Sequence, residues 1–313
     1  MDRFIIVRHG ARHDYAHKEA WKARCAASDG YHEVKDPPLS SVGHAQARLV
    51  GTFLGEHVLA RDAARGAAVT LVCSPYVRAM QTARPTAEIL GLPLRIDGAV
   101  CEGPHRFPAI APRKDGDLAA WREQRFVDFT HVVDDTYVPT VAFGIAPLGT
   151  DPADTVYVPT EATFRDNLDR LLVARAALED RYFKADDPPS SPRGDAAADD
   201  AAVAMQGRTV VCFTHAATCV GLAAALCGSP LHALEAAAPA GVWILTRSVM
   251  QRGSRPRGAW SPALQSGIDH LGEVQDATTS PWTFPERFAA VWAELVAETA
   301  AARGHSPSLT SDD

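Results

Sequence analysis

The feature that most constrains the fold of this chain is a set of short, uniformly apolar runs that alternate with helical segments. Residues 4–7, 69–73 and 209–213 each form such a run, which is typical of a strand buried on both faces. Strands of this kind belong to a mostly parallel sheet that helices cover on both sides. The sequence therefore predicts an α/β fold, a three-layer α/β/α sandwich with a mostly parallel central sheet.

Capping signals delimit the helices between these strands. Ser40 or Ser41 can cap a helix over residues 43–59, and Gly91 can end the helix that follows the second strand. Ser74 precedes Pro75, so we expect a serine N-cap with proline at the first helical position. The other expected elements are strands at 94–96 and 241–246 and helices at 118–129, 160–183, 216–226 and 284–302.

One domain is predicted over residues 1–303 of the 313. Residues 103–159 show weak periodicity, so we expect an irregular insertion there. Residues 184–207 are rich in Pro, Asp, Ser and Ala and cannot bury enough apolar area to offset their ordering entropy. We therefore expect a disordered loop and no domain boundary, because the strand at 209–213 needs the earlier strands to pair with. Residues 304–313 are expected to form a loose tail.

Composition argues against several classes of partner. The net charge is −7, and no basic cluster indicates a nucleic-acid partner. No apolar stretch approaches the ~20 residues that cross a bilayer. The N-terminus lacks a secretory signal, so we expect a cytoplasmic protein without a membrane partner. None of the six cysteines forms a C-x-x-C pair, so no metal site is expected.

Polar residues follow three of the predicted strands. Arg8 and His9 come after the first, the segment from Ser74 to Arg78 after the second, and Thr214 and His215 after the third of the long runs. Ligands of parallel α/β sheets bind beyond the carboxyl ends of the strands. We therefore expect these side chains to converge on one site.

The residue types at these ends fit phosphate chemistry. A neutral histidine such as His9 can accept a phosphoryl group. Arginine forks bind phosphate oxygens, and Arg8, Arg12 and Arg78 are the candidates. The remaining candidates are His215, as a further phosphate donor, and Glu102, as the acid that protonates a leaving oxygen.

The segments VRHGAR, CSPYVRAMQTA, Cys101-Glu102 and CFTHAAT together resemble the histidine phosphatase, or phosphoglycerate-mutase-like, superfamily. Within it, Arg12, the segment VDDTYVP and the layout PPLSSVGHAQA are similar to the phosphatase domain of the suppressors of T-cell receptor signalling. The resemblance implies an α/β/α sandwich and catalysis without a metal or other cofactor.

The resemblance also implies a role for each candidate residue. His9 would become the phosphohistidine, and Arg8, Arg78 and His215 would complete the phosphate pocket. Arg12 would add a contact particular to the subgroup, and Glu102 would be the proton donor. Ala11 departs from the pattern, since these phosphatases usually carry an acid there. The chain begins at the first strand, so we expect the catalytic module alone and no signalling role.

Three functions remain open at this stage. The leading hypothesis is a phosphomonoesterase that uses a phosphohistidine on His9, with a phosphorylated small molecule or a phosphoprotein as substrate. Phosphotyrosine-like or other bulky phosphomonoesters are the expected class. The alternatives are a phosphoglycerate-type mutase and a catalytically silent phosphate-binding protein of the same fold. The sequence indicates neither the physiological substrate nor the oligomeric state.

Overall fold

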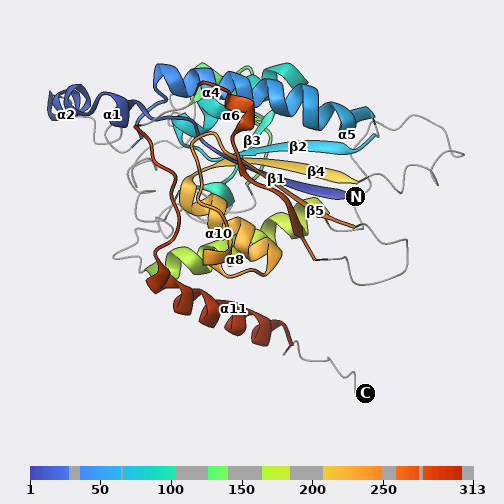
Figure 1. Ribbon diagram of the computed structural model, residues 1–313. Coiled ribbons are helices and arrows are strands. Elements are labelled where there is room, and N and C mark those ends of the chain that lie inside the picture. The colour runs from blue at the N-terminus through green and yellow to red at the C-terminus, as the bar shows by residue number, and fades with distance from the viewer. Residues whose placement is uncertain are drawn as a thin grey trace, which may run out of the picture.

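A computed structural model describes residues 1–27, 36–64, 66–102, 126–139, 164–183, 207–248, 259–274 and 278–304. Its central sheet has the strand order β3-β2-β4-β1-β5-β6 (Figure 1). The strands are β1 (Asp2–Arg8), β2 (Ala68–Cys73), β3 (Leu94–Ile96), β4 (Arg208–Thr214), β5 (Val242–Arg247) and β6 (Ser261–Gly267). The first four are mutually parallel, whereas β5 and β6 pair antiparallel. The predicted mostly parallel sheet is confirmed.

Helices cover both faces of the sheet (Figure 1). On one face lie α4 (Ser41–Thr52), α5 (Ala60–Ala64) and α6 (Val77–Leu90); on the other lie α8 (Phe164–Phe183), α10 (Ala216–Cys227) and α11 (Ala289–Gly304). Side chains of β1 alternate between the two cores: Phe4 and Ile6 pack with the α8–α10 layer, and Ile5 and Val7 with the α4–α6 layer. Because every one of these four is fully buried, the centre of β1 must be apolar. The three-layer sandwich is confirmed.

The predicted ends of two helices are found. Ser40 caps α4 by accepting the Gly43 N–H at 3.1 Å. After Thr52 the same helix continues as a π-helical segment, Phe53–Leu59. Gly91 ends α6 in the left-handed region, with φ at 62°. Local capping signals therefore predicted the start of α4 and the end of α6, the helix that carries most of the sequence CSPYVRAMQTA.

The expected serine cap of α6 is wrong. The helix begins at Val77, and its N-cap is Tyr76, whose side chain makes no capping hydrogen bond. The Ser74 hydroxyl lies instead 2.8 Å from Nε2 of His215. The last helix, α11, also starts later than expected, after a 3-10 turn at Glu286–Phe288. Strand β6 was not expected from the sequence.

Most of the insertion 103–159 lies outside the described residues, as do 184–206 and the tail after 304. The domain boundaries, the disordered loop and most of the helix expected at 118–129 therefore stay predictions. The described part, 126–139, runs beside β3: Leu94 N–H donates to Val132 O at 2.6 Å, and Asp134 N–H donates to Leu94 O at 2.9 Å. Among the described helices, none combines the length and apolar character that crossing a membrane requires.

Candidate active site

The carboxyl ends of β1, β2 and β4 lie side by side. Hydrogen bonding between the strands continues past their last residues: His9 N–H donates to Thr214 O at 2.9 Å, and Ser74 N–H donates to Phe213 O at 3.0 Å. The rings of His9 and His215 lie 5.3 Å apart between centroids. The structure thus gathers the polar residues of three strand ends at one edge of the sheet.

His9 is buried, with 2% of its surface exposed, and is held in one tautomer. Its Nδ1 lies 2.8 Å from Gly10 O. Because a carbonyl oxygen can only accept, Nδ1 carries the proton and Nε2 carries the lone pair. Burial, and then the nearby Arg78 and His215, hold the pKa of His9 well below its ordinary value of 6.5. A neutral imidazole with an unprotonated Nε2 can attack phosphorus.

The loop that follows His9 is fixed by the motifs on α4 and α6. Gly10 N–H donates to Thr82 Oγ1 at 3.1 Å, and Ala11 N–H donates to Gln46 Oε1 at 2.8 Å. A Cβ on Gly10 would lie 2.8 Å from Gly43 O, and one on Gly43 would lie 2.1 Å from Ala11 O. Glycine is required at both positions, because the loop touches the N-terminus of α4.

Arg78 lies in the first turn of α6 and is fully buried. Nη1 donates to Asp36 Oδ1 at 3.0 Å, and Nη2 donates to Glu102 Oε2. The guanidinium carbon stacks 4.4 Å from the centre of the Tyr76 ring. Asp36 Oδ2 also accepts the Val77 N–H at 3.0 Å, so one carboxylate holds both the arginine and the start of its helix.

His215 joins the same cluster. Its Nε2 lies 2.8 Å from Ser74 Oγ, and its Nδ1 lies 3.8 Å from Glu102 Oε2. The Tyr76 ring meets the imidazole edge to face, 4.8 Å between centroids. Because Ser74 is engaged here, it does not cap α6.

Arg8 and Arg12 lie beside this cluster but bind other groups. Arg8 Nη1 donates to the carbonyls of Ala237 at 2.6 Å and Ser280 at 3.2 Å, and burial lowers the pKa of Arg8 to about 10. Arg12 places its fork on Asp14, with distances of 2.9 and 2.7 Å. Burial opposes its charge, but the hydrogen bonds to Asp14 raise the pKa of Arg12. Four of the six predicted site residues, His9, Arg78, Glu102 and His215, are therefore joined by direct contacts.

A family model described as histidine phosphatase superfamily (branch 1) matches residues 4–107. That segment contains the strand-end motifs of β1 and β2 and extends past Glu102. Over these residues the chain is similar to the histidine phosphatase superfamily.

Two known proteins extend this comparison. Mouse ubiquitin-associated and SH3 domain-containing protein A is 34% identical over 109 residues, which are 28% of this chain and 16% of that relative. The match therefore spans a small part of the relative, and it agrees with the subgroup that the sequence resembles. The ecdysone phosphate phosphatase from Bombix mori, solved with tungstate, is 17% identical with a TM-score of 0.51, covering 92% of this chain and 99% of that one. The second likeness shows the shared histidine phosphatase fold.

No group of three or more His, Cys, Asp or Glu side chains in the described ranges is arranged to hold a metal ion. All six cysteines are free thiols, four of them buried. Burial raises the pKa of Cys73 and Cys212 well above the ordinary value, so these thiols stay protonated. Metal independence stays a prediction.

Sequence reasoning missed Asp36 as a residue of the site and gave Ser74 a different role. Asp36 is buried against Arg78, which lies 42 positions further along the chain. Its only sequence signal is an acid directly before two prolines, and Glu33 stands close by. Ser74 was recognised, but its position before Pro75 favoured a capping role.

Proposed function

We propose that this protein hydrolyses phosphomonoesters through a phosphohistidine formed on His9. The observation that carries the proposal is the state of His9, a buried neutral imidazole whose Nδ1–H is tied to Gly10 O. The match of residues 4–107 to the histidine phosphatase superfamily supports phosphate-ester hydrolysis as the general class.

The first displacement transfers the phosphoryl group to the enzyme. Nε2 of His9 attacks phosphorus, an N–P bond forms, and the P–O bond to the leaving group breaks. Arg78, Arg8 and His215 stabilise the equatorial oxygens, with Arg12 as a further donor once its fork leaves Asp14. Such donors act most strongly on charge that develops in the transition state.

Glu102 serves both displacements as acid and base. In its protonated form it donates to the departing oxygen, so that an alcohol leaves. The resulting carboxylate then takes a proton from water, which attacks phosphohistidine and releases phosphate. At the end of the cycle Nε2 has its lone pair and Glu102 its proton again. Glu102 lies against Arg78 and 3.8 Å from His215, beside the groups proposed to bind the phosphate, and this proximity supports the role.

The proposed substrates are aryl or other bulky phosphomonoesters. The short helix α1 (His13–Ala16) begins directly after the His9 loop and places Tyr15, 47% exposed, beside Arg12. The His13 ring is tilted against that of His17, 4.6 Å between centroids, and meets Trp21 edge to face at 5.8 Å. A ring-bearing leaving group has flat partners here. The resemblance to phosphatases of T-cell regulators supports the same class.

The test is hydrolysis of p-nitrophenyl phosphate by wild type and His9→Ala, with a chelator present. We expect His9→Ala to lose about 10³-fold or more in kcat, because no other group supplies the nucleophile. His131→Ala is the matched control, since His131 is exposed and, among the residues that the structure describes, pairs with Glu88.

Retention of wild-type turnover by His9→Ala would exclude the phosphohistidine mechanism. A wild type that isomerises phosphoglycerates without releasing phosphate would favour a mutase instead. Turnover of small sugar phosphates alone would contradict the proposed substrate class.

A further inference from the structure

The segment that leads from the 3-10 turn Gly98–Val100 to Glu102 has its carbonyl groups bound one after another. Thr214 Oγ1 donates to Val100 O at 2.5 Å, and Thr218 Oγ1 donates to Cys101 O at 2.7 Å. Both threonines belong to the CFTHAAT motif that carries His215. The backbone before Glu102 is therefore fastened to the strand and helix that hold the site.

An arginine from α8, which covers the face of the sheet opposite α4 and α6, also binds this segment. Arg170, on α8, donates through Nη2 to Cys101 O at 3.1 Å and through Nη1 to Ala99 O at 3.4 Å. Nη2 also lies 3.5 Å from Thr218 Oγ1. Three successive carbonyls, those of Ala99, Val100 and Cys101, thus accept hydrogen bonds immediately before Glu102.

The guanidinium of Arg170 is costly to keep in this place. Its Nε is sealed from solvent and has no hydrogen-bond partner among the described residues, and burial lowers the pKa of Arg170. No salt bridge joins it to a carboxylate in the part of the chain that the structure describes. Neutral donors could bind the same carbonyls without desolvating a charge. Glu102 is one of the titratable groups within its electrostatic reach, after Cys101 and Tyr76.

We propose that Arg170 is a positioning residue that fixes the loop at residues 99–101 so that Glu102 is aimed at the leaving oxygen. The inference rests on the proposed function, because it gives Arg170 a role through the acid. Arg170 touches neither His9 nor the Arg78 fork in any contact found among the described residues, so it would serve proton transfer and not phosphate binding.

Leaving-group dependence separates this role from a merely structural one. p-Nitrophenolate can leave as the anion, whereas an alkyl leaving group must be protonated as it departs. Because Glu102 also acts in the second displacement, which is common to all substrates, the measured quantity is the single-turnover rate of leaving-group release. Arg170→Met should keep this rate for p-nitrophenyl phosphate within about threefold but lose about 10²-fold for an alkyl phosphomonoester, the lower end of general-acid contributions. Arg170→Lys keeps the charge but not the fork and should recover part of the alkyl activity. Arg175→Met, on the same helix and paired with Glu179, should lose equally little for both substrates.

Two further variants keep the outcomes distinguishable. Glu102→Gln should show the same split between substrates; if it does not, the proposed role of Glu102 fails, and the inference fails with it. If Glu102→Gln shows the split but folded Arg170→Met loses both activities alike or neither, the inference alone is overturned. Should Arg170→Met not fold, Thr218→Val removes one bond to Cys101 O and decides in its place. It should shift the alkyl-to-aryl ratio in the same direction by about threefold to tenfold, and an unchanged ratio contradicts the proposal.

Discussion

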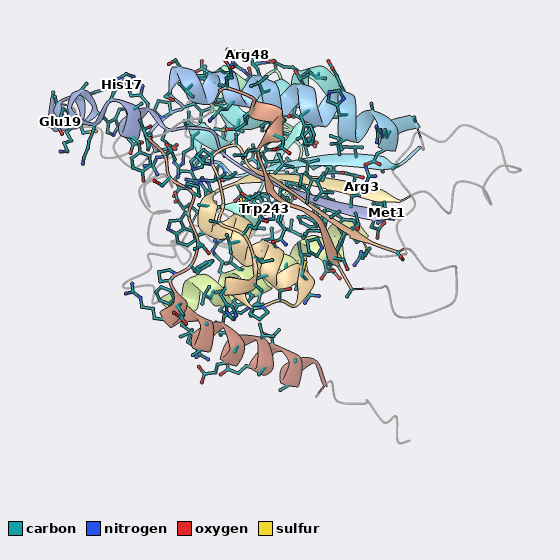
Figure 2. The ribbon with its side chains drawn as sticks, in the orientation of Figure 1. Met1, Arg3, His17, Glu19, Arg48 and Trp243 are labelled. Atoms are coloured by element: carbon teal, nitrogen blue, oxygen red, sulfur yellow. The ribbon has the colours of Figure 1, made fainter. Side chains whose placement is uncertain are left out.

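The central sheet has two edges in the direction of its parallel strands, one where they begin and one where they end, and arginines are held differently at each. At the edge where β1 begins, Arg247 pairs with Asp2 at 3.1 Å and with Glu179 at 3.0 Å, and Arg3 pairs with Asp62 at 2.7 Å. At the edge where β1 ends, Arg78 pairs with Asp36 and Glu102, and Arg12 pairs with Asp14. Arg8 and Arg170, in contrast, bind carbonyl oxygens and, within the described ranges, no carboxylate. Figure 2 shows Met1 and Arg3 at one end of the sheet and His17 and Glu19 at the other.

This contrast indicates which edge is built for an anion. An edge whose arginines are all matched by carboxylates has little net attraction left for an anion. Cations bound to neutral oxygens keep a positive field, and a phosphate entering there gains from it. Because the whole chain has a net charge of −7, this positive charge is local to the catalytic edge and not general to the protein.

The difference between the two edges is tested most directly by removing one arginine from each. Arg78→Met should lower kcat/KM by about 10³-fold, because a donor to the transferring phosphoryl group is lost. Arg247→Met should leave kcat/KM within about threefold but lower the free energy of unfolding by about 3 kcal/mol, since Asp2 loses its partner. Steady-state kinetics and chemical denaturation measure the two effects. A folded Arg247→Met enzyme as impaired as Arg78→Met would show that both edges serve catalysis.

The second prediction concerns the pH dependence of stability at the catalytic edge. The pKa of His9 in the folded protein lies below 6.5, so the unfolded chain binds a proton there that the folded chain does not. Stability from this residue is present above pH 6.5 and is lost as the pH falls below it, by up to about 1.4 kcal/mol per pH unit. His9→Gln removes that loss, so wild type and variant should diverge below pH 6.5 and run parallel above pH 7. Denaturation curves at several pH values give the comparison, and parallel behaviour throughout would mean that His9 is not held neutral.

Much of the fold was open to prediction because its signals are local. Apolar runs placed β1, β2 and β4 to within two residues at either end, and Ser40 and Gly91 marked helix ends through their own backbone geometry. Strand β6 escaped because its sequence, SPALQSG, has no apolar alternation and includes a proline. It forms only as an edge strand against β5, which supplies what its own sequence lacks.

The site was predictable where residues stand at strand ends and not where a tertiary contact gives them their role. His9, Arg78 and His215 follow from parallel strands whose ends meet. Asp36 acquires its importance only when the chain folds it against Arg78. Arg170 lies on a helix of the other layer, and nothing in its surroundings in the sequence points to the loop before Glu102. Positioning residues are therefore the part of such a site that sequence patterns reveal least.

The smallest predicted effect concerns Ser74. Its hydroxyl lies 2.8 Å from His215 Nε2, so it fixes the ring that Glu102 approaches through Nδ1. Ser74→Ala removes one neutral hydrogen bond, which contributes about 1 kcal/mol, and should reduce kcat about fivefold to tenfold with little change in KM. Thr209→Val, which removes a buried hydroxyl bonded to Asp62 at the other edge, should lower stability by a similar amount and leave kcat unchanged. If Ser74→Ala changed stability alone, as Thr209→Val should, the hydroxyl would belong to the fold, and the catalytic edge would owe its activity to the charged residues alone.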